Sequence, residues 1–199
     1  MIDTAFLEVF YEHITSICLD CYEKKETDVI SLAEKCMDIN GLPMHCPPHH
    51  YMIPAVLLTV CHKLQGHPME YLKKDLEEAN QRAHNVLGGF CGFYGSCGAA
   101  VGVGIFMSIF TDTEPCSEKT WSWTNRATAE ALMAISKIDG PRCCKRNSYL
   151  ALSSACDTAK KYLSLDIPRK DKIICRYYKL NNECKGRKCP YFPEGRDEK

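Results

Sequence analysis

The sequence predicts a mainly α-helical protein, a single helical domain followed by a small cysteine-rich metal knuckle. Two observations support this fold class. Apolar residues recur at helical spacing through most of residues 1–167, and residues typical of helix ends separate these stretches. From residue 168 onward the chain turns polar and basic and loses the helical period, while cysteines continue. We therefore predict a helical domain over 1–167 and a knuckle with its tail over 168–199.

The expected helices follow from this spacing and from the residues that cap them. Thr27 is the expected cap of the second helix, Asn40-Gly41 ends it, and Ser117 is the expected cap of the sixth. Pro54 suits the first turn of the third helix, where its missing N–H does no harm. The predicted ranges are 3–22, 27–38, 53–64, 68–86, 97–110, 121–138 and a last helix that opens near Cys143 and runs to 163.

The stretch from Gly88 to Gly104 is the most unusual part of the sequence, because seven of its seventeen residues are glycine. Glycine gains nothing in packing, so this density indicates that the backbone closely approaches something else. Cys97 should stand at the start of a buried helix, where the helix dipole lowers the pKa of a thiol. The alternative is a loop and a tightly packed helix with two inert cysteines. The glycine spacing does not match a nucleotide-binding loop.

Composition narrows the classes of function. The net charge is zero, so neither nucleic acid nor an anionic membrane is an expected partner. No apolar run is long enough to span a membrane, and the first residues lack the basic region of a signal peptide, so we expect a cytoplasmic protein. Fourteen cysteines in such a chain indicate metal binding or redox chemistry rather than structural disulfides.

A proline-rich loop at 42–51 carries histidines at 45, 49 and 50 and a cysteine at 46. Imidazole and thiolate are good ligands for transition metals, and prolines stiffen the loop at little entropic cost. We expect His49 and His50 to act as acid–base groups or as alternative ligands. The alternative is that one histidine caps the next helix and the others are solvated.

Two further cysteine positions precede predicted helices. Cys116 lies in a turn before the sixth helix, and Cys143-Cys144 opens the last one, followed by Lys145 and Arg146. The basic residues should lower the pKa of these thiols further and hold an anionic group. The alternative, a buried structural cysteine, suits one of the adjacent pair but hardly both.

The C-terminal region contains Cys175, Cys184 and Cys189-Pro190. Three cysteines within about fifteen residues, one of them before a proline, are typical of a metal knuckle. Its fourth ligand is left open among Cys156, a histidine and a cysteine of the helical domain.

The segment around Cys91 and Cys97-Gly98-Ala99-Ala100-Val101-Gly102 resembles putative redox-active proteins named for a Cys…Gly-Cys-Ala-x-x-Gly…Cys…Cys pattern. Ser96 departs from that pattern, which has glycine there. Most of the chain resembles an uncharacterised prokaryotic domain found beside or fused to SAM-dependent methyltransferases, which implies a methyltransferase or redox partner. The motifs that carry this second resemblance lie at 43–50, 140–146 and 175–190. The glycine-rich segment is also similar to the cluster loop of iron–sulfur serine dehydratases and cysteine desulfidases.

These features together predict an iron–sulfur protein whose [4Fe–4S] cluster lies where helix N-termini converge. The expected cluster ligands are Cys91, Cys97, Cys116 and Cys143, with Cys144 as a free catalytic thiolate, although Cys143 and Cys144 are interchangeable at this point. The groups expected to contact the cluster are Gly92, Gly95, Gly98, Lys145 and Arg146.

The cluster would serve sulfur transfer or desulfuration of a small sulfur-containing substrate, or electron transfer. Zinc or an iron–sulfur cluster would occupy the knuckle. Two alternatives remain. One is a dithiol/disulfide redox enzyme that uses Cys91–Cys97 or Cys143–Cys144, the first being the better pair because adjacent cysteines form only a strained bridge. The other is a non-catalytic zinc-stabilised interaction module.

Overall fold

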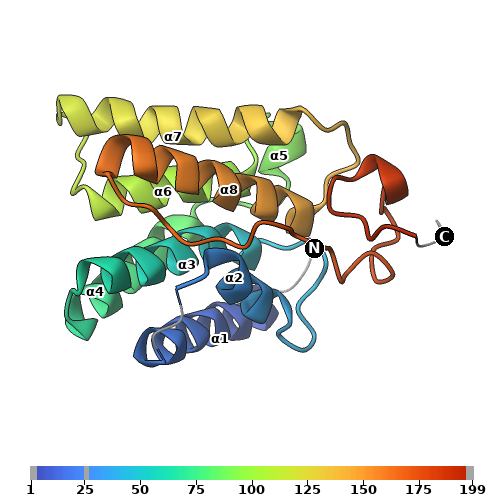
Figure 1. The fold of residues 1–199 in the computed structure, drawn as a ribbon, viewed down its shortest axis with the longest axis horizontal. Coiled ribbons are helices and arrows are strands. Elements are labelled where there is room, and N and C mark those ends of the chain that lie inside the picture. The colour runs from blue at the N-terminus through green and yellow to red at the C-terminus, as the bar shows by residue number, and fades with distance from the viewer. Residues whose placement is uncertain (1–3, 25–26, 196–199) are drawn as a thin grey trace.

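Helix α6 (Gly98–Phe110) lies at the centre of the fold, packed between α3 (Pro48–Gln65) and α7 (Lys119–Ser136). The computed structural model describes residues 4–24 and 27–195. Helix α8 (Cys144–Leu163) packs against α7, α6 and α3. Figure 1 shows α7 and α8 as one layer and α1 to α4 as another, with α6 between them. No strand occurs in these residues, which confirms the all-helical prediction.

The remaining elements complete the two layers. They are α1 (Thr4–Glu23), α2 (Val29–Met37), α4 (Met69–His84), the short α5 (Phe90–Phe93) and the 3₁₀ turn η1 (Gly186–Lys188). Within the described ranges, no helix is both long enough and apolar enough to cross a bilayer.

Several helix boundaries differ from the predictions. Helix α3 begins at Pro48, five residues before the predicted start, because Pro47 and Pro48 stand where a helix lacks N–H partners in any case. The cap of α2 is Asp28 rather than Thr27, with the Asp28 carboxylate accepting from Ser31 N–H at 2.6 Å. Helix α7 starts after Glu118, and the Ser117 hydroxyl instead accepts from Glu114 N–H.

The glycines of α6 allow the close approach that the sequence indicates. A Cβ at Gly102 would lie 2.8 Å from the His50 carbonyl oxygen and 2.8 Å from Ile53 Cβ. A Cβ at Gly98 would lie 2.2 Å from the His50 ring. Helices α3 and α6 therefore pack with almost no side-chain layer between them at their N-terminal ends.

The chain after α8 runs back along that helix without regular structure except η1 (Figure 1). Polar contacts hold its first part against α2: Val29 N–H donates to the Pro168 carbonyl at 3.0 Å, and the Tyr177 hydroxyl donates to Asp38 at 2.8 Å. Leu165, Ile167 and Tyr177 are buried in the same core as the helices. The metal knuckle expected here stays a prediction.

Replacing Glu34 by alanine should loosen this C-terminal segment and lower the free energy of unfolding by about 2 kcal/mol. The Glu34 carboxylate is nearly buried, pairs with Lys170 at 2.7 Å and accepts from the Tyr149 hydroxyl at 3.3 Å. Urea unfolding and proteolysis of the segment would measure the effect. Glu114→Ala, at an exposed position, is the control, and equal stability of the two variants would contradict the expectation.

Candidate functional site: thiols at three helix N-termini

The N-terminal ends of α3, α6 and α8 meet at one end of the bundle (Figure 1). Cys97 is the cap residue of α6 and Cys143 is the cap residue of α8, while Cys46 lies two residues before α3. Three helix N-termini, each the positive end of a helix dipole, therefore lie in one region. Such a region stabilises negative charge.

Cys46 and His49 form a buried pair at the start of α3. The Cys46 Sγ lies 3.2 Å from His49 Nδ1, and the same Nδ1 lies 3.2 Å from the Cys46 carbonyl oxygen. His49 is only 1% exposed, and its Nε2 has no hydrogen-bond partner. Burial holds the pKa of His49 well below the usual range, with Lys145 adding to the effect. A neutral imidazole of this kind is a ligand or a proton acceptor rather than a cation.

Cys97 and Cys144 lie beside this pair. The Asn147 side-chain amide donates to Cys97 Sγ at 3.4 Å, and the Cys144 backbone N–H donates to His45 Nδ1 at 3.4 Å. Burial first, and then the nearby Cys46, Cys97 and Cys143, raise the pKa of Cys144 to about 12. Cys144 therefore lies near Cys46 and Cys97 as well as near its neighbour in the chain, Cys143.

The pKa of Cys144 corrects the sequence-based expectation that a helix N-terminus and basic neighbours would make it a free thiolate. Burial outweighs those effects, and Arg142 offsets only a little of the increase. Burial likewise raises the pKa of Cys46 to about 12, although Lys145 lowers it in part. Both thiols are therefore protonated at neutral pH unless a bound cation displaces the protons.

Two basic residues in the first turn of α8, Lys145 and Arg146, lie close to these thiols. Lys145 is 1% exposed, and its ammonium donates to the Met37 carbonyl at 3.2 Å and lies 4.9 Å from the centre of the Tyr177 ring. Burial lowers the pKa of Lys145 to about 8, an effect that Cys46 and Cys144 partly oppose. Arg146 donates to the Pro141 carbonyl at 2.9 Å, and its Nε is buried without a partner.

A pocket of about 610 Å³ opens beside Cys97. The glycine-rich loop lines one side of it, through Gly92, Gly95 and Cys91. The end of α7 and the start of α8 line the other side. The polar side chains of that side are Ser136, Arg142, Arg146 and Asn147. The Asn147 Oδ1 is buried without a hydrogen-bond partner. Two guanidinium groups suit this pocket to a small anionic molecule.

The other predicted site residues are distributed as follows. His50 Nδ1–H donates to the Val86 carbonyl at 2.9 Å, and the His50 ring covers Gly98. Burial lowers the pKa of His50. The structure does not bring Cys116 to the group, because it follows the opposite end of α6, a helix about 20 Å long. Cys116 is exposed there.

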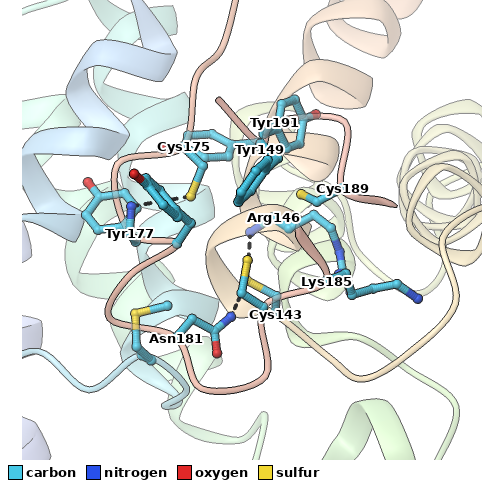
Figure 2. A pocket seen from close by; sticks show the side chains of 13 residues that line it. Cys143, Arg146, Tyr149, Cys175, Tyr177, Asn181, Lys185, Cys189 and Tyr191 are labelled. Atoms are coloured by element: carbon cyan, nitrogen blue, oxygen red, sulfur yellow. Dashed lines mark hydrogen bonds between the residues drawn. The ribbon is translucent and has the colours of Figure 1, made fainter. Parts of the chain in front are cut away.

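Cys143 also lies apart from the predicted cluster ligands. Although it neighbours Cys144, it lines a separate small cavity together with Cys175, Cys184 and Cys189 (Figure 2). The chain direction at the start of α8 gives the two adjacent side chains different surroundings. Of the two, Cys144 is thus the one that belongs with Cys46 and Cys97.

Sequence reasoning placed Cys46 in the histidine loop but did not include it in the thiol group. The signal was present, because Cys46 precedes Pro47-Pro48, and proline is favoured at the first helical position. Starting α3 there would have put Cys46 at a helix N-terminus like Cys97. The role of Asn147 beside Cys97 had no sequence signal.

Whether the group of Cys46, Cys97, Cys144 and His49 can bind a metal depends first on the chemistry of these side chains. Three thiols and a neutral histidine are soft ligands that suit iron–sulfur clusters, zinc or copper. In the ranges 4–24 and 27–195, no three cysteine, histidine or carboxylate side chains already stand close enough to hold an ion. Binding would therefore have to draw the sulfurs together.

The fold and this site define an all-helical, cysteine-rich protein with buried thiols at converging helix N-termini. The chain belongs to the DUF5714 family, described as a family of unknown function, whose match covers residues 14–192. No curated protein matches the chain. No solved structure matches it either.

Proposed function

We propose that this chain is an iron–sulfur protein in which Cys46, Cys97 and Cys144 hold the cluster. One observation carries the proposal: three thiols from the starts of three helices lie near one another in a partly buried, positively charged region. The partners for the negative charge of a cluster are the helix N-termini, Lys145 and Arg146. The unpartnered His49 Nε2 and Asn147 Oδ1 are available to a group bound there.

The raised pKa values of Cys46 and Cys144 favour metal binding over dithiol chemistry at these two cysteines, which are not the pair of the Cys91–Cys97 alternative. A thiol with a pKa of about 12 is a poor nucleophile at neutral pH, because thiolate is the reactive form. Coordination to iron removes the proton, so the same burial that suppresses disulfide chemistry is compatible with a cluster.

The pocket indicates what the cluster acts on. Cys97 belongs to the thiol group and also lines the 610 Å³ pocket, so a molecule in the pocket is next to the bound group. Arg142 and Arg146 supply positive charge for a carboxylate or sulfide-bearing substrate. When bound, the cluster would supply electron transfer or an iron site for sulfur transfer.

Anaerobic purification followed by measurement of iron and acid-labile sulfide per chain tests the proposal. The wild-type protein should be brown and contain both, while Cys97→Ser and Cys144→Ser should lose both at least tenfold. Cys116→Ser is the matched control, because this exposed cysteine lies at the far end of α6 and should leave the iron content unchanged.

Three results would contradict the proposal. One is a wild-type protein that binds no iron after reconstitution with iron and sulfide. Another is equal iron in the Cys97, Cys144 and Cys116 variants. The third is colourless protein whose thiol count changes reversibly with oxidant, which would favour the dithiol alternative.

A further inference from the structure

The small cavity at the start of α8 contains four cysteines from two distant parts of the chain. Cys143 comes from the cap position of α8, and the other three come from the irregular C-terminal segment. The cysteines that line it are Cys143, Cys175, Cys184 and Cys189. In Figure 2 the labelled sulfurs of Cys143, Cys175 and Cys189 point toward a common space.

We propose that these four cysteines bind one zinc ion that fastens the C-terminal segment to the N-terminus of α8. Four thiolates are a common ligand set for structural zinc, and Cys184 and Cys189 are separated by four residues, as in many zinc knuckles. Cys143 is then the fourth ligand that the C-terminal sequence by itself lacks. The site is separate from the group of Cys46, Cys97 and Cys144.

The surroundings of the sulfurs suit thiolates. Cys143 Sγ accepts from Arg146 N–H at 3.5 Å and from the Asn181 side-chain amide at 3.5 Å. Cys175 Sγ accepts from Tyr177 N–H at 3.4 Å. Donors of this kind orient metal-bound sulfurs and reduce their charge. The pKa of Cys175 is raised to about 11, mainly by burial and in smaller part by Cys143, Cys189 and Cys184, which line the same cavity.

The size of the cavity favours a single ion over a cluster. Its volume is about 20 Å³, whereas one water needs about 10–15 Å³. A zinc ion needs its sulfurs at about 2.3 Å, and no three metal-binding side chains among the described residues already stand close enough to hold an ion, so binding requires the four side chains to move inward. A [4Fe–4S] cluster is much larger and would force apart the aromatic wall of Tyr149, Tyr177 and Tyr191.

The C-terminal segment also has a structural need for such a link. From residue 164 to 195 the only regular element is the three-residue η1, and irregular segments of this length are rarely held by packing alone. Backbone hydrogen bonds place the cysteines at turns: Cys184 N–H donates to the Asn181 carbonyl at 3.2 Å, and Cys189 N–H donates to the Gly186 carbonyl at 2.9 Å. Zinc would add the cross-link that these turns lack.

The sharpest test compares adjacent residues. Protein expressed with zinc in the medium should contain one zinc per chain by mass spectrometry, and Cys143→Ser and Cys184→Ser should lose at least 90% of it. Cys144→Ser differs from Cys143→Ser by one position and should keep its zinc. Because Cys144 belongs to the proposed iron–sulfur site, iron loss in that variant with zinc retained would separate the two proposals.

Cobalt substitution provides a readout that does not depend on zinc retention. The wild-type chain should give the spectrum of tetrahedral cobalt with four sulfur ligands, and Cys143→His should bind cobalt with three sulfurs and one nitrogen. Circular dichroism of each variant would check that the helices remain.

Any of three results would overturn the zinc site. One is four-sulfur cobalt in Cys143→Ser, which would remove Cys143 from the ligand set. Another is a wild-type chain that takes up neither zinc nor cobalt in stoichiometric amount. The third is a Cys184→Ser variant that loses iron and sulfide but keeps its zinc.

Discussion

Gly102→Ala is expected to lower the free energy of unfolding by about 3 kcal/mol, a large effect for one methyl group. The new Cβ would lie 2.8 Å from the His50 carbonyl oxygen, 2.8 Å from Ile53 Cβ and 3.0 Å from Pro54 Cδ. These are backbone or near-backbone atoms of α3, and they cannot rotate away. Alanine's helix propensity, worth about 1 kcal/mol over glycine, does not offset a forced separation of the two helices.

Thermal and urea unfolding would measure this effect, and the melting temperature should fall by about 10 °C. Gly92→Ala is the control, because a Cβ there meets no atom within 4 Å. Separation of α3 from α6 should also move Cys97 away from Cys46 and reduce iron binding in Gly102→Ala. Equal stability of the two alanine variants would show that α3 and α6 can accommodate the added methyl group at Gly102.

Alkaline pH should destabilise the protein steeply, through cysteines that lie outside both proposed metal sites. The pKa of Cys36 is raised well above its usual value by its hydrogen bond with Cys18 and by burial, and the pKa of Cys61 is raised by burial. Burial also raises the pKa of Cys156 to about 11. In the unfolded chain these thiols titrate near 8.5.

The direction in which stability changes with pH follows from how many protons the folded and unfolded chains bind. Between about pH 8.5 and the folded-state pKa values, the folded protein keeps protons that the unfolded chain releases, so stability falls as the pH rises. Each thiol contributes up to about 1.4 kcal/mol per pH unit, and the three together up to about 4 kcal/mol per unit. Below pH 8.5 this contribution to stability is fully present.

Urea unfolding at pH 7.5, 8.5 and 9.5, with a reductant and a chelator present, would measure the slope. Cys61→Ala should lose some stability at pH 7.5 because of the cavity it leaves, but its stability should fall less steeply above pH 8.5. Cys116→Ala, which changes an exposed cysteine, should keep the wild-type slope. A wild-type stability that is flat from pH 7.5 to 9.5 would contradict the expectation.

The iron–sulfur and zinc proposals assign the adjacent Cys143 and Cys144 to different sites, and the sequence by itself does not show this assignment. Cys143 and Cys144 are adjacent, and their spacing to other cysteines supports either grouping. In the structure the Asn181 side chain contacts Cys143 from the C-terminal segment, whereas His45 from the loop before α3 contacts the backbone of Cys144. The side of α8 on which each residue starts thus determines which metal site it can join.

The sequence by itself determined the helical class, the close approach at Gly98 and Gly102, and the position of Cys97 at a helix start. These properties depend on local spacing, on the missing Cβ of glycine and on the residues that begin helices, so neighbours in the chain suffice to reveal them.

Only the tertiary structure decided which thiols meet. Cys116 lies beyond the opposite end of α6. Cys144 lies near both Cys46 and Cys97, whereas Cys143 lines a cavity together with the C-terminal cysteines. The tertiary structure also reversed the expected direction of the Cys144 pKa, because the desolvation of a thiol depends on how completely distant helices cover it. Burial of this kind is a property of packing between α3, α6 and α8, and local sequence does not contain it.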